Sequence, residues 1–241
     1  MKFALIGHPV AGSLSPRLFT AAYNGRYPYE LVDRERFEDA WDVFLNEYQG
    51  VNVTAPFKQD AYARVENMSE EARRSGAVNL VDKRARGLYA TNTDIDGVVS
   101  ALQETGRTFT QALVVGTGGA ARAAVVGAKK LGCRVCVTGR SANKVQDFVN
   151  AFGCESVPFE ELSALLPQLI IYTLPGRAPV PQGLNFAESV VLEAEYRQPV
   201  LEGLPCREYI HGKRWLLGQA IAGYQIFTGE KPNMENLLNA I

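Results

Sequence analysis

The chain has 241 residues, 46% of them apolar, which is enough to bury a full core in one or two domains. Its formal net charge of −1 gives no electrostatic reason to expect a nucleic-acid or membrane-surface partner. The first apolar run is too short for a signal peptide, and none approaches the roughly eighteen residues of a spanning helix. We therefore expect a soluble, cytoplasmic protein.

The four cysteines do not suggest a metal site. Cys133 and Cys136 form a C-x-x-C pair around the expected strand 134–138. Residues three apart on a strand point to opposite faces, so joint chelation is not expected. With only two histidines and no second C-x-x-C, we predict no bound metal and interpret the cysteines as small buried apolar residues.

The first segment opens with an expected strand, 2–6, followed by a small-residue loop that contains Ser13 and Ser15. Ser15 followed by Pro16 is typical of a helix N-terminus, and Ser15 is expected to be its N-cap. Capping is the simpler explanation of Ser15, whereas Ser13 has no such structural role. Two hydroxyls at a strand-to-helix turn also suit a polyhydroxylated ligand.

A strand at 29–32, a helix at 37–48 and a strand at 51–54 follow, and this β-α-β-α-β order predicts a parallel sheet covered by helices. Pro56 cannot continue the strand, and Lys58 stands directly after it. A lone lysine is usually a solvated surface residue. Here the strand end delivers it to the sheet edge where α/β proteins build their sites.

Next come a charged helix at 69–74, a strand at 77–81 with the polar Asn79 inside it, and a hairpin partner at 87–90. Asp94 precedes a helix at 95–104, and aspartate is a preferred N-cap. The topology nevertheless brings Asp94 and Lys58 to the same edge of the sheet.

A dinucleotide-binding pattern opens the second segment. Gly116, Gly118 and Ala121 fit G-x-G-x-x-G/A after a strand at 111–115 and at the start of a helix that runs to Leu131. In this context the glycines let backbone N–H groups approach a pyrophosphate at the helix N-terminus.

The residues at the end of the next strand, 134–138, indicate which dinucleotide the chain binds. A site that prefers NAD places an acid there to hold the ribose 2′-hydroxyl. This chain instead has Arg140, Ser141 and Lys144, which suit a 2′-phosphate. The residues alone therefore predict NADP(H).

The alternation continues with a helix at 142–152, a strand at 156–159, a helix at 160–166 and strands at 169–174, 190–192 and 208–210. The proline-rich loop 175–182 is expected near the nicotinamide. A helix from Trp215 to Thr228 and a final helix at 234–241 should pack back onto the first segment. The predicted domains are 1–97 with 219–241, and 98–218.

Together these motifs resemble those of the shikimate dehydrogenases over nearly the whole chain. The matching segments, in the family's order, are Ser13-Leu14-Ser15-Pro16, Asn52 to Lys58, Gly76 to Asn79, Asn92-Thr93-Asp94, Gly116 to Ala120, Gly139-Arg140-Ser141, and the single residues Tyr196 and Gln219. Each motif alone is weak, whereas seven in order are specific.

The resemblance implies an α/β protein in which an N-terminal substrate-binding and catalytic domain and a Rossmann-type NADP-binding domain are separated by a cleft. It implies NADPH-dependent reduction of 3-dehydroshikimate to shikimate, in the biosynthesis of chorismate and aromatic amino acids, by a monomer or homodimer. Lys58 and Asp94 would be catalytic. The implied substrate contacts are Ser13, Ser15, Thr54, Asn79, Tyr196 and Gln219. The implied cofactor contacts are Gly116, Gly118, Gly119, Ala120, Arg140, Ser141, Lys144, Thr173 and Gly212.

The chain departs from the family's usual residues at Gly12, Phe19, Thr20, Gly139, Ser141, Tyr172 and Leu174. These changes leave Lys58 and Asp94 intact but alter the phosphate loop and the loop beside the nicotinamide. Alternative functions are a dehydrogenase for quinate or an aminated analogue, a non-catalytic metabolite sensor, and a methylene-folate-type dehydrogenase.

Overall fold

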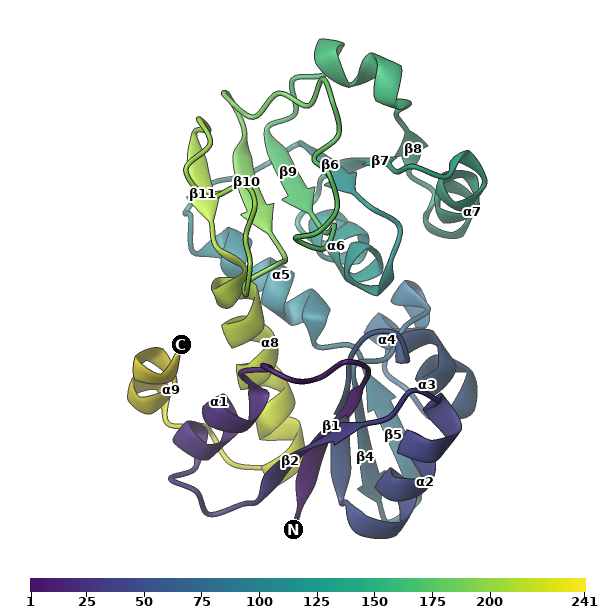
Figure 1. Cartoon of the computed structure of the whole chain (residues 1–241), viewed down its shortest axis with the longest axis vertical. Coiled ribbons are helices and arrows are strands. Elements are labelled where there is room, and N and C mark those ends of the chain that lie inside the picture. Colours follow the sequence, from purple (N-terminus) through teal and green to yellow (C-terminus); the bar gives the residue numbers. More distant parts are fainter. The chain divides into compact units, whose positions relative to one another are not determined.

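The computed structural model describes all residues, 1–241, and they form two compact units. One unit comprises Met1–Thr93 and Leu217–Ile241, and the other Asp94–Leu216 (Figure 1). None of the helices combines the length and apolar character needed to cross a membrane. The assignment of the first unit to a substrate and the second to a cofactor stays a prediction at this point.

The first unit is built on a mixed five-stranded sheet. Its strands are β1 (Phe3–Gly7), β2 (Tyr29–Asp33), β3 (Gly50–Val53), β4 (Leu80–Arg84) and β5 (Gly87–Thr91), in the order β2-β1-β3-β4-β5. β1 pairs in parallel with β2 and β3, while β4 is antiparallel to β3 and β5. The predicted parallel core and the hairpin are both confirmed, but the strand expected at 77–81 is Leu80–Arg84, so Asn79 lies before this strand and not inside it.

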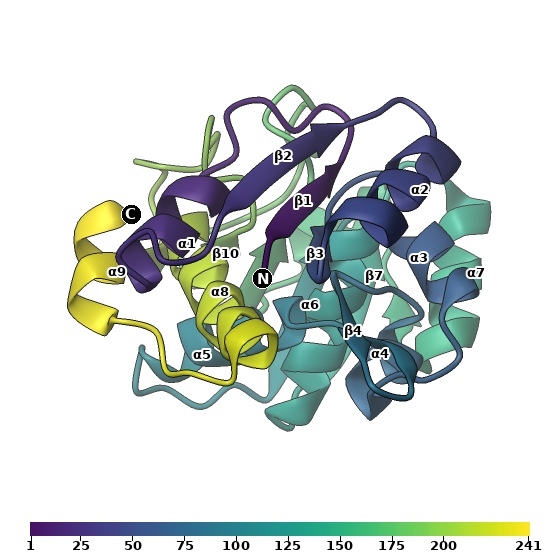
Figure 2. The same ribbon diagram turned by 90° about the horizontal axis from the view of Figure 1, so that it is seen from below.

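Helices cover both faces of this sheet (Figure 2). They are α1 (Ser15–Ala22), α2 (Phe37–Glu47), α3 (Lys58–Arg64), α4 (Glu70–Ser75), α8 (Gly212–Thr228) and α9 (Met234–Ala240). α2 and α3 pack on one face, where Trp41 and Phe44 of α2 and Ala61 of α3 lie in one cluster with the alternate strand residues Ala4 and Ile6. The opposite face is covered by α1 and the C-terminal part of α8.

An aromatic cluster fills the space under α1 and α8. Phe19 lies at its centre, with ring centroids 5.3 Å from Phe3, 5.2 Å from Tyr23, 4.8 Å from Tyr29 and 4.7 Å from Tyr224. Tilted and edge-on pairs at these separations are favourable beyond the area that they bury. The cluster therefore fixes α1, and with it the loop that precedes this helix.

The second unit is a parallel Rossmann-type sheet, as predicted. Its strands are β6 (Gln111–Val115), β7 (Arg134–Thr138), β8 (Glu155–Ser156), β9 (Leu169–Tyr172), β10 (Val190–Glu193) and β11 (Glu208–Ile210), in the order β11-β10-β9-β6-β7-β8. Its helices are α5 (Asp94–Gln103), α6 (Gly119–Lys130), α7 (Ala142–Phe152) and the 3₁₀ helix η1 (Phe159–Ala164).

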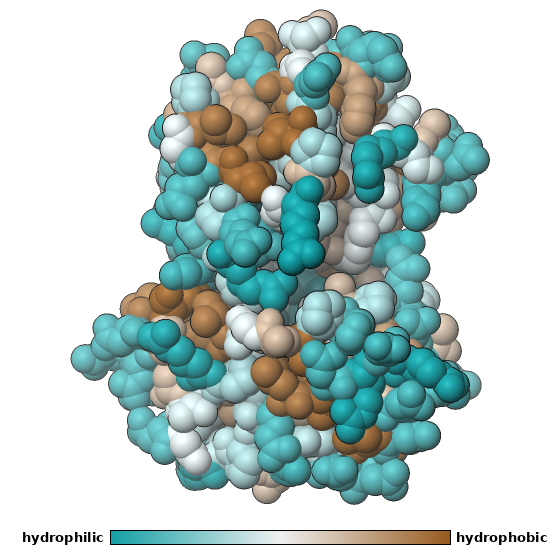
Figure 3. Space-filling view, in the orientation of Figure 1, coloured by the Kyte–Doolittle hydropathy of each residue, from teal (hydrophilic) through white to brown (hydrophobic).

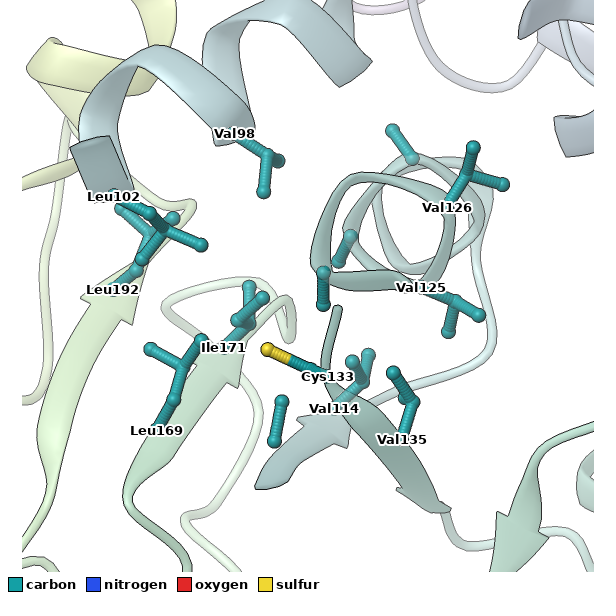
Figure 4. Packing of buried hydrophobic residues seen from close by; sticks show 14 of the residues in the cluster. Val98, Leu102, Val114, Val125, Val126, Cys133, Val135, Leu169, Ile171 and Leu192 are labelled. Carbon is teal, nitrogen blue, oxygen red and sulfur yellow. The ribbon is translucent and has the colours of Figure 1, made fainter. Parts of the chain in front are cut away.

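The core between α5, α6 and this sheet is entirely apolar at its centre (Figure 4). Val98 and Leu102 from α5 and Val125 from α6 pack over strand residues such as Ile171. Cys133 lies in this core. Cys136 lies in the cluster on the other face of the sheet, which confirms that the C-x-x-C pair straddles a strand.

The other face of the second sheet is covered mainly by η1 and by the non-helical connections around β10. Leu162, Phe186 and Leu201 pack there against the strands. Figure 3 shows hydrophobic surface over β9, β10 and β11 in the orientation of Figure 1. The connection after β10 thus carries part of this face's core as well as Tyr196.

Several predicted boundaries were wrong. The expected helix at 160–166 is η1, and the expected strand at 156–159 is the short β8, which ends two residues before Pro158. The strand predicted to reach Leu174 ends at Tyr172. The long C-terminal helix begins at Gly212, three residues before Trp215. The first three errors lie where a short apolar run fits more than one period, whereas the polar residues Lys213 and Arg214 hid the start of the long helix.

The packing of α5 on α6 generates a stability test. Alanine in place of a helical glycine ordinarily stabilises a protein by about 0.5–1 kcal/mol. A Cβ at Gly127 would lie 2.8 Å from Cγ1 of Val98, so Gly127→Ala should instead lower the free energy of unfolding by about 1–3 kcal/mol. Urea unfolding measures the change.

A double variant provides the control. In Val98→Ala/Gly127→Ala the new methyl has room, so the combined loss should be smaller than the sum of the two single losses. A Gly127→Ala protein more stable than wild type would contradict the close approach of the helices.

Candidate functional site

The loop after β1 holds Ser13 and Ser15 close together. The Ser13 hydroxyl donates to Ser15 Oγ at 3.2 Å, and the backbone N–H of Ser15 donates to Ser13 Oγ at 3.3 Å. The prediction that Ser15 caps α1 was wrong, because the helix begins at Ser15, the N-cap is Leu14 and no side chain caps it. The Ser15 hydroxyl accepts from Ser13 instead, and the Ser15 carbonyl accepts from the Tyr224 hydroxyl at 3.2 Å.

A second contact anchors the same loop and was not expected from the sequence. Asp33, at the end of β2, accepts a hydrogen bond from the backbone N–H of Val10 at 3.1 Å and pairs with His8 Nδ1 at 2.7 Å. The Val10 N–H, and then the His8 side chain, lower the pKa of the Asp33 carboxyl. These partners lie 23 and 25 residues away in the chain, so no local pattern indicates them.

Three buried polar side chains form a network at the start of β4. Asn79 Oδ1 accepts from the backbone N–H of Thr93 at 2.7 Å. Asn79 Nδ2 donates to Thr93 Oγ1 at 3.1 Å and to Gln219 Oε1 at 3.3 Å. The structure therefore brings together the predicted residues Asn79 and Gln219, and it adds Thr93.

Lys58 lies next to this network through its backbone. It is the first residue of α3, and its carbonyl oxygen accepts from the N–H of Val78 at 2.9 Å. Thr54 closes the turn before α3, because its carbonyl accepts from Phe57 N at 3.0 Å. Both predicted side chains, Thr54 and Lys58, are half-buried.

Asp94 is the residue that follows Thr93, and it is the first residue of α5 and of the second unit. It is 9% exposed. A carboxylate this buried is unusual unless it is paired. Its burial at a helix start agrees with a role for the side chain beyond contact with solvent.

The glycine loop of the second unit joins a glycine of positive φ to the start of α6. Gly116 has φ +120°, a conformation that favours glycine, and a side chain there would overlap the Thr173 hydroxyl. Thr173 Oγ1 donates to the Val115 carbonyl at 2.8 Å and so belongs to the wall of the turn. α6 starts at Gly119 with Gly118 as its N-cap, so Gly119 and Ala120 form its first turn.

A cavity of about 290 Å³ lies beside the end of β7. Its lining residues are Gly139, Arg140, Ala142, Val145, Gln146, Ser156, Val157, Pro158, Phe159 and Glu160. Of the three residues expected at a 2′-phosphate, Arg140 lines the cavity. Ser141 Oγ accepts from Lys144 N at 3.4 Å and so caps α7. Phe159 and Glu160 were not expected here, because their segment was predicted as the end of a strand and the start of an α-helix and is instead η1.

The loop that carries Tyr196 is anchored by Glu193, the last residue of β10. This fully buried carboxylate accepts from Val200 N at 2.7 Å, Leu201 N at 3.2 Å and the Tyr209 hydroxyl at 2.6 Å. Burial, and then Glu193, raise the pKa of Tyr209. At the same place Gly212 opens α8, where a Cβ would lie 2.6 Å from the Glu193 carbonyl oxygen.

Comparisons with known proteins agree with these features. Residues 5–81 match the family model described as the shikimate dehydrogenase substrate binding domain. An NADP-dependent shikimate dehydrogenase from one strain of Thermus thermophilus is 34% identical over 213 residues, which cover 82% of this chain and 79% of the relative. The chain belongs to the shikimate dehydrogenase family.

Solved structures extend the likeness to the whole fold. The shikimate dehydrogenase of a second Thermus thermophilus strain, solved in complex with NADP(H) and shikimate, is 29% identical, with a TM-score of 0.86 over 100% of this chain and 98% of that one. The Mycobacterium tuberculosis enzyme is 28% identical, with a TM-score of 0.81 over 99% and 98%. An Ael1 enzyme of Pseudomonas putida, 22% identical with a TM-score of 0.82, shares the fold. The family uses NADP.

Proposed function

We propose that this protein catalyses the reversible NADPH-dependent reduction of 3-dehydroshikimate to shikimate, with Lys58 as general acid and base. The observation that carries the proposal is the buried network of Asn79, Thr93 and Gln219, which lies beside the backbone of Lys58. Directional amides next to a lysine suit a small substrate with several hydroxyls and a reacting carbonyl. Family membership supplies the substrate class.

The other predicted substrate contacts fit this chemistry. Ser13 and Ser15 supply hydroxyls for a carboxylate, and Thr54 stands at the turn before Lys58. Asp94 and Tyr196, from the second unit, are proposed as partners for ring hydroxyls, and Asp94 also as the group that orients the lysine. A site whose buried polar groups pair with the hydroxyls of its substrate strongly rejects analogues that lack those hydroxyls, because the groups would then stay unpaired.

The second unit fits NADP(H). Gly116 adopts a backbone conformation that suits the loop, and Arg140 lines the cavity beside β7, where its guanidinium would pair with a 2′-phosphate. When bound, NADPH supplies the hydride for the carbonyl carbon. Lys58 donates a proton to the oxygen as negative charge develops there, and takes it back in the oxidation direction.

A spectrophotometric assay tests the function directly. Wild-type protein should reduce NADP⁺ with shikimate. It should be less efficient with NAD⁺, because Arg140 and not an acid follows the end of β7. It should also be less efficient with quinate than with shikimate. Higher efficiency with quinate than with shikimate would instead support the alternative function, a quinate dehydrogenase. No turnover with either substrate, alongside measurable NADPH binding, would favour a metabolite sensor.

Lys58 has a matched test. Lys58→Ala should lower kcat by roughly 10²- to 10⁴-fold, the loss typical of a general acid–base group, while the dissociation constant of shikimate changes little. The exposed Lys231 provides the control, since Lys231→Ala should leave kcat unchanged. A Lys58→Ala enzyme with wild-type kcat would remove the lysine from the mechanism.

Gly118 separates cofactor binding from folding. Nothing in the protein lies within 4 Å of a Cβ placed there, so Gly118→Ala should keep the wild-type unfolding midpoint. The methyl would stand between the backbone and a pyrophosphate, so the dissociation constant of NADPH should rise about tenfold or more, equivalent to about 1.4 kcal/mol.

Gly116→Ala is the contrasting variant. It should lose stability as well as NADPH affinity, because Gly116 has a positive φ and a Cβ there would overlap the Thr173 hydroxyl. Wild-type NADPH affinity in Gly118→Ala would show that the cofactor does not approach this turn.

A further inference from the structure

The loop that carries Ser13 follows β1, the strand between β2 and β3 in the first sheet. β1 and β2 run side by side in the same direction, and Gly7 at the end of β1 stands opposite Asp33 at the end of β2 (Figure 2). On its other side β1 pairs in parallel with β3, whose last residue precedes Thr54. The loop therefore starts at the carboxyl edge of the sheet, flanked by Asp33 and by the turn at Thr54.

Backbone contacts hold the loop on the side of β3. The N–H of His8 donates to the carbonyl oxygen of Ala55 at 3.1 Å, and the N–H of Thr54 donates to the carbonyl oxygen of Ile6 at 2.9 Å. The approach is close, because a Cβ at Gly7 would lie 2.4 Å from Cγ2 of Thr54 and 2.9 Å from the Ala55 carbonyl oxygen. These contacts fix the first residue of the loop against the turn that leads to α3.

One carboxylate holds the loop on the side of β2. Asp33 Oδ1 lies 2.7 Å from Nδ1 of His8, and Asp33 Oδ2 accepts from the backbone N–H of Val10 at 3.1 Å. The two oxygens thus contact the residues on either side of Pro9. Hydrogen bonds to an ionised acceptor are stronger than those to a neutral one. Asp33 therefore ties the loop to β2 beyond its first residue.

Val10 connects Asp33 to Ser13. The N–H of Ser13 donates to the Val10 carbonyl oxygen at 3.1 Å, which closes a turn of two exposed residues. Val10 itself is 2% exposed. The position of Ser13 thus follows that of Val10, and Ser13 Oγ in turn meets the hydroxyl of Ser15 at 3.2 Å and its N–H at 3.3 Å.

We propose that Asp33 is a positioning residue for the substrate carboxylate. It holds Val10, and Val10 places the Ser13 hydroxyl beside Ser15. This inference rests on the proposed function, since it takes Ser13 and Ser15 as the carboxylate contacts.

Asp33 touches neither the substrate nor the cofactor in this assignment and acts through Ser13. The substrate carboxylate does not react, so contacts to it are equally strong in the ground state and the transition state. Loss of such uniform binding raises KM and leaves kcat unchanged.

Glu30 provides a matched control for Asp33. Both are carboxylates of β2, with side chains 49% and 41% exposed. Glu30 Oε2 accepts from the Tyr48 hydroxyl at 2.7 Å and lies 3.1 Å from Nζ of Lys2, and both partners are outside the serine loop. Glu30→Ala and Asp33→Ala thus each remove a paired, half-exposed carboxylate from the same strand, and one of the two holds the loop.

The experiment measures KM for shikimate, KM for NADP⁺ and kcat in both variants, with thermal unfolding midpoints to show that both proteins fold. Asp33→Ala should raise KM for shikimate roughly three- to tenfold, the effect of one hydrogen bond, and leave kcat and KM for NADP⁺ within about twofold. Glu30→Ala should change neither KM. Equal KM values for shikimate in the two variants would overturn the proposal.

The conservative variant Asp33→Asn separates position from charge. Its amide oxygen can still accept from the Val10 N–H, so KM for shikimate should stay within about twofold of wild type. A KM as high as that of Asp33→Ala would contradict positioning through this hydrogen bond. Should Asp33→Ala not fold, Asp33→Val removes the same acceptors, suits a strand and should give the same selective rise in KM.

A double-variant cycle tests whether Asp33 acts through Ser13. The KM for shikimate in Asp33→Ala/Ser13→Ala should equal that of Ser13→Ala alone, because no hydroxyl is left to position. Multiplied effects of the two substitutions would show that Asp33 acts by another route and would refute the proposal.

Failure of the proposed function gives a different result. Wild-type protein that does not oxidise shikimate would refute that function and this inference with it. Wild-type activity combined with indistinguishable Glu30→Ala and Asp33→Ala variants would refute the positioning role alone.

Discussion

The structure of the first unit depends on the hydrogen bonds of one buried asparagine. The backbone of Asn79 joins β3 through Val53 and the end of β5 through Thr91, and its side chain holds Thr93 and Gln219. Leaving such a buried polar atom unpaired costs about 1–3 kcal/mol. All of these elements must therefore be in place together, and the orientation of the amide is determined by its partners.

Helix α8 can complete this network only because it comes close to the sheet. Gln219 and Gly223 are four residues apart and share one face of α8. A Cβ at Gly223 would lie 3.1 Å from Leu80 Cδ1 and 3.4 Å from Thr93 Oγ1, tighter than ordinary contacts. The glycine thus sets the helix at the distance where the Gln219 side chain reaches Asn79. A segment more than a hundred residues away along the chain supplies this side chain.

The sequence predicts local features well and long-range side-chain partners poorly. The strand–glycine–helix pattern at Gly116 and the alternation of strands and helices each lie within one short window, so their periods reveal them. Ser15 also carries a local signal, that of an N-cap, and this signal is misleading. Its hydroxyl accepts from Ser13 instead, and its carbonyl accepts from the hydroxyl of Tyr224, which only the packing of α8 against α1 brings close. The same holds for Asp33 and His8, at the ends of two neighbouring parallel strands.

The fixed position of Thr93 restricts the residue that follows it, Asp94. Its backbone N–H and its hydroxyl are both held by Asn79, and it is 1% exposed, so the end of the first unit's chain is fixed at this residue. Asp94 follows by one peptide bond and opens α5. Since a peptide unit is planar and leaves two soft dihedral angles per residue, a rigid Thr93 restricts where the next Cα lies.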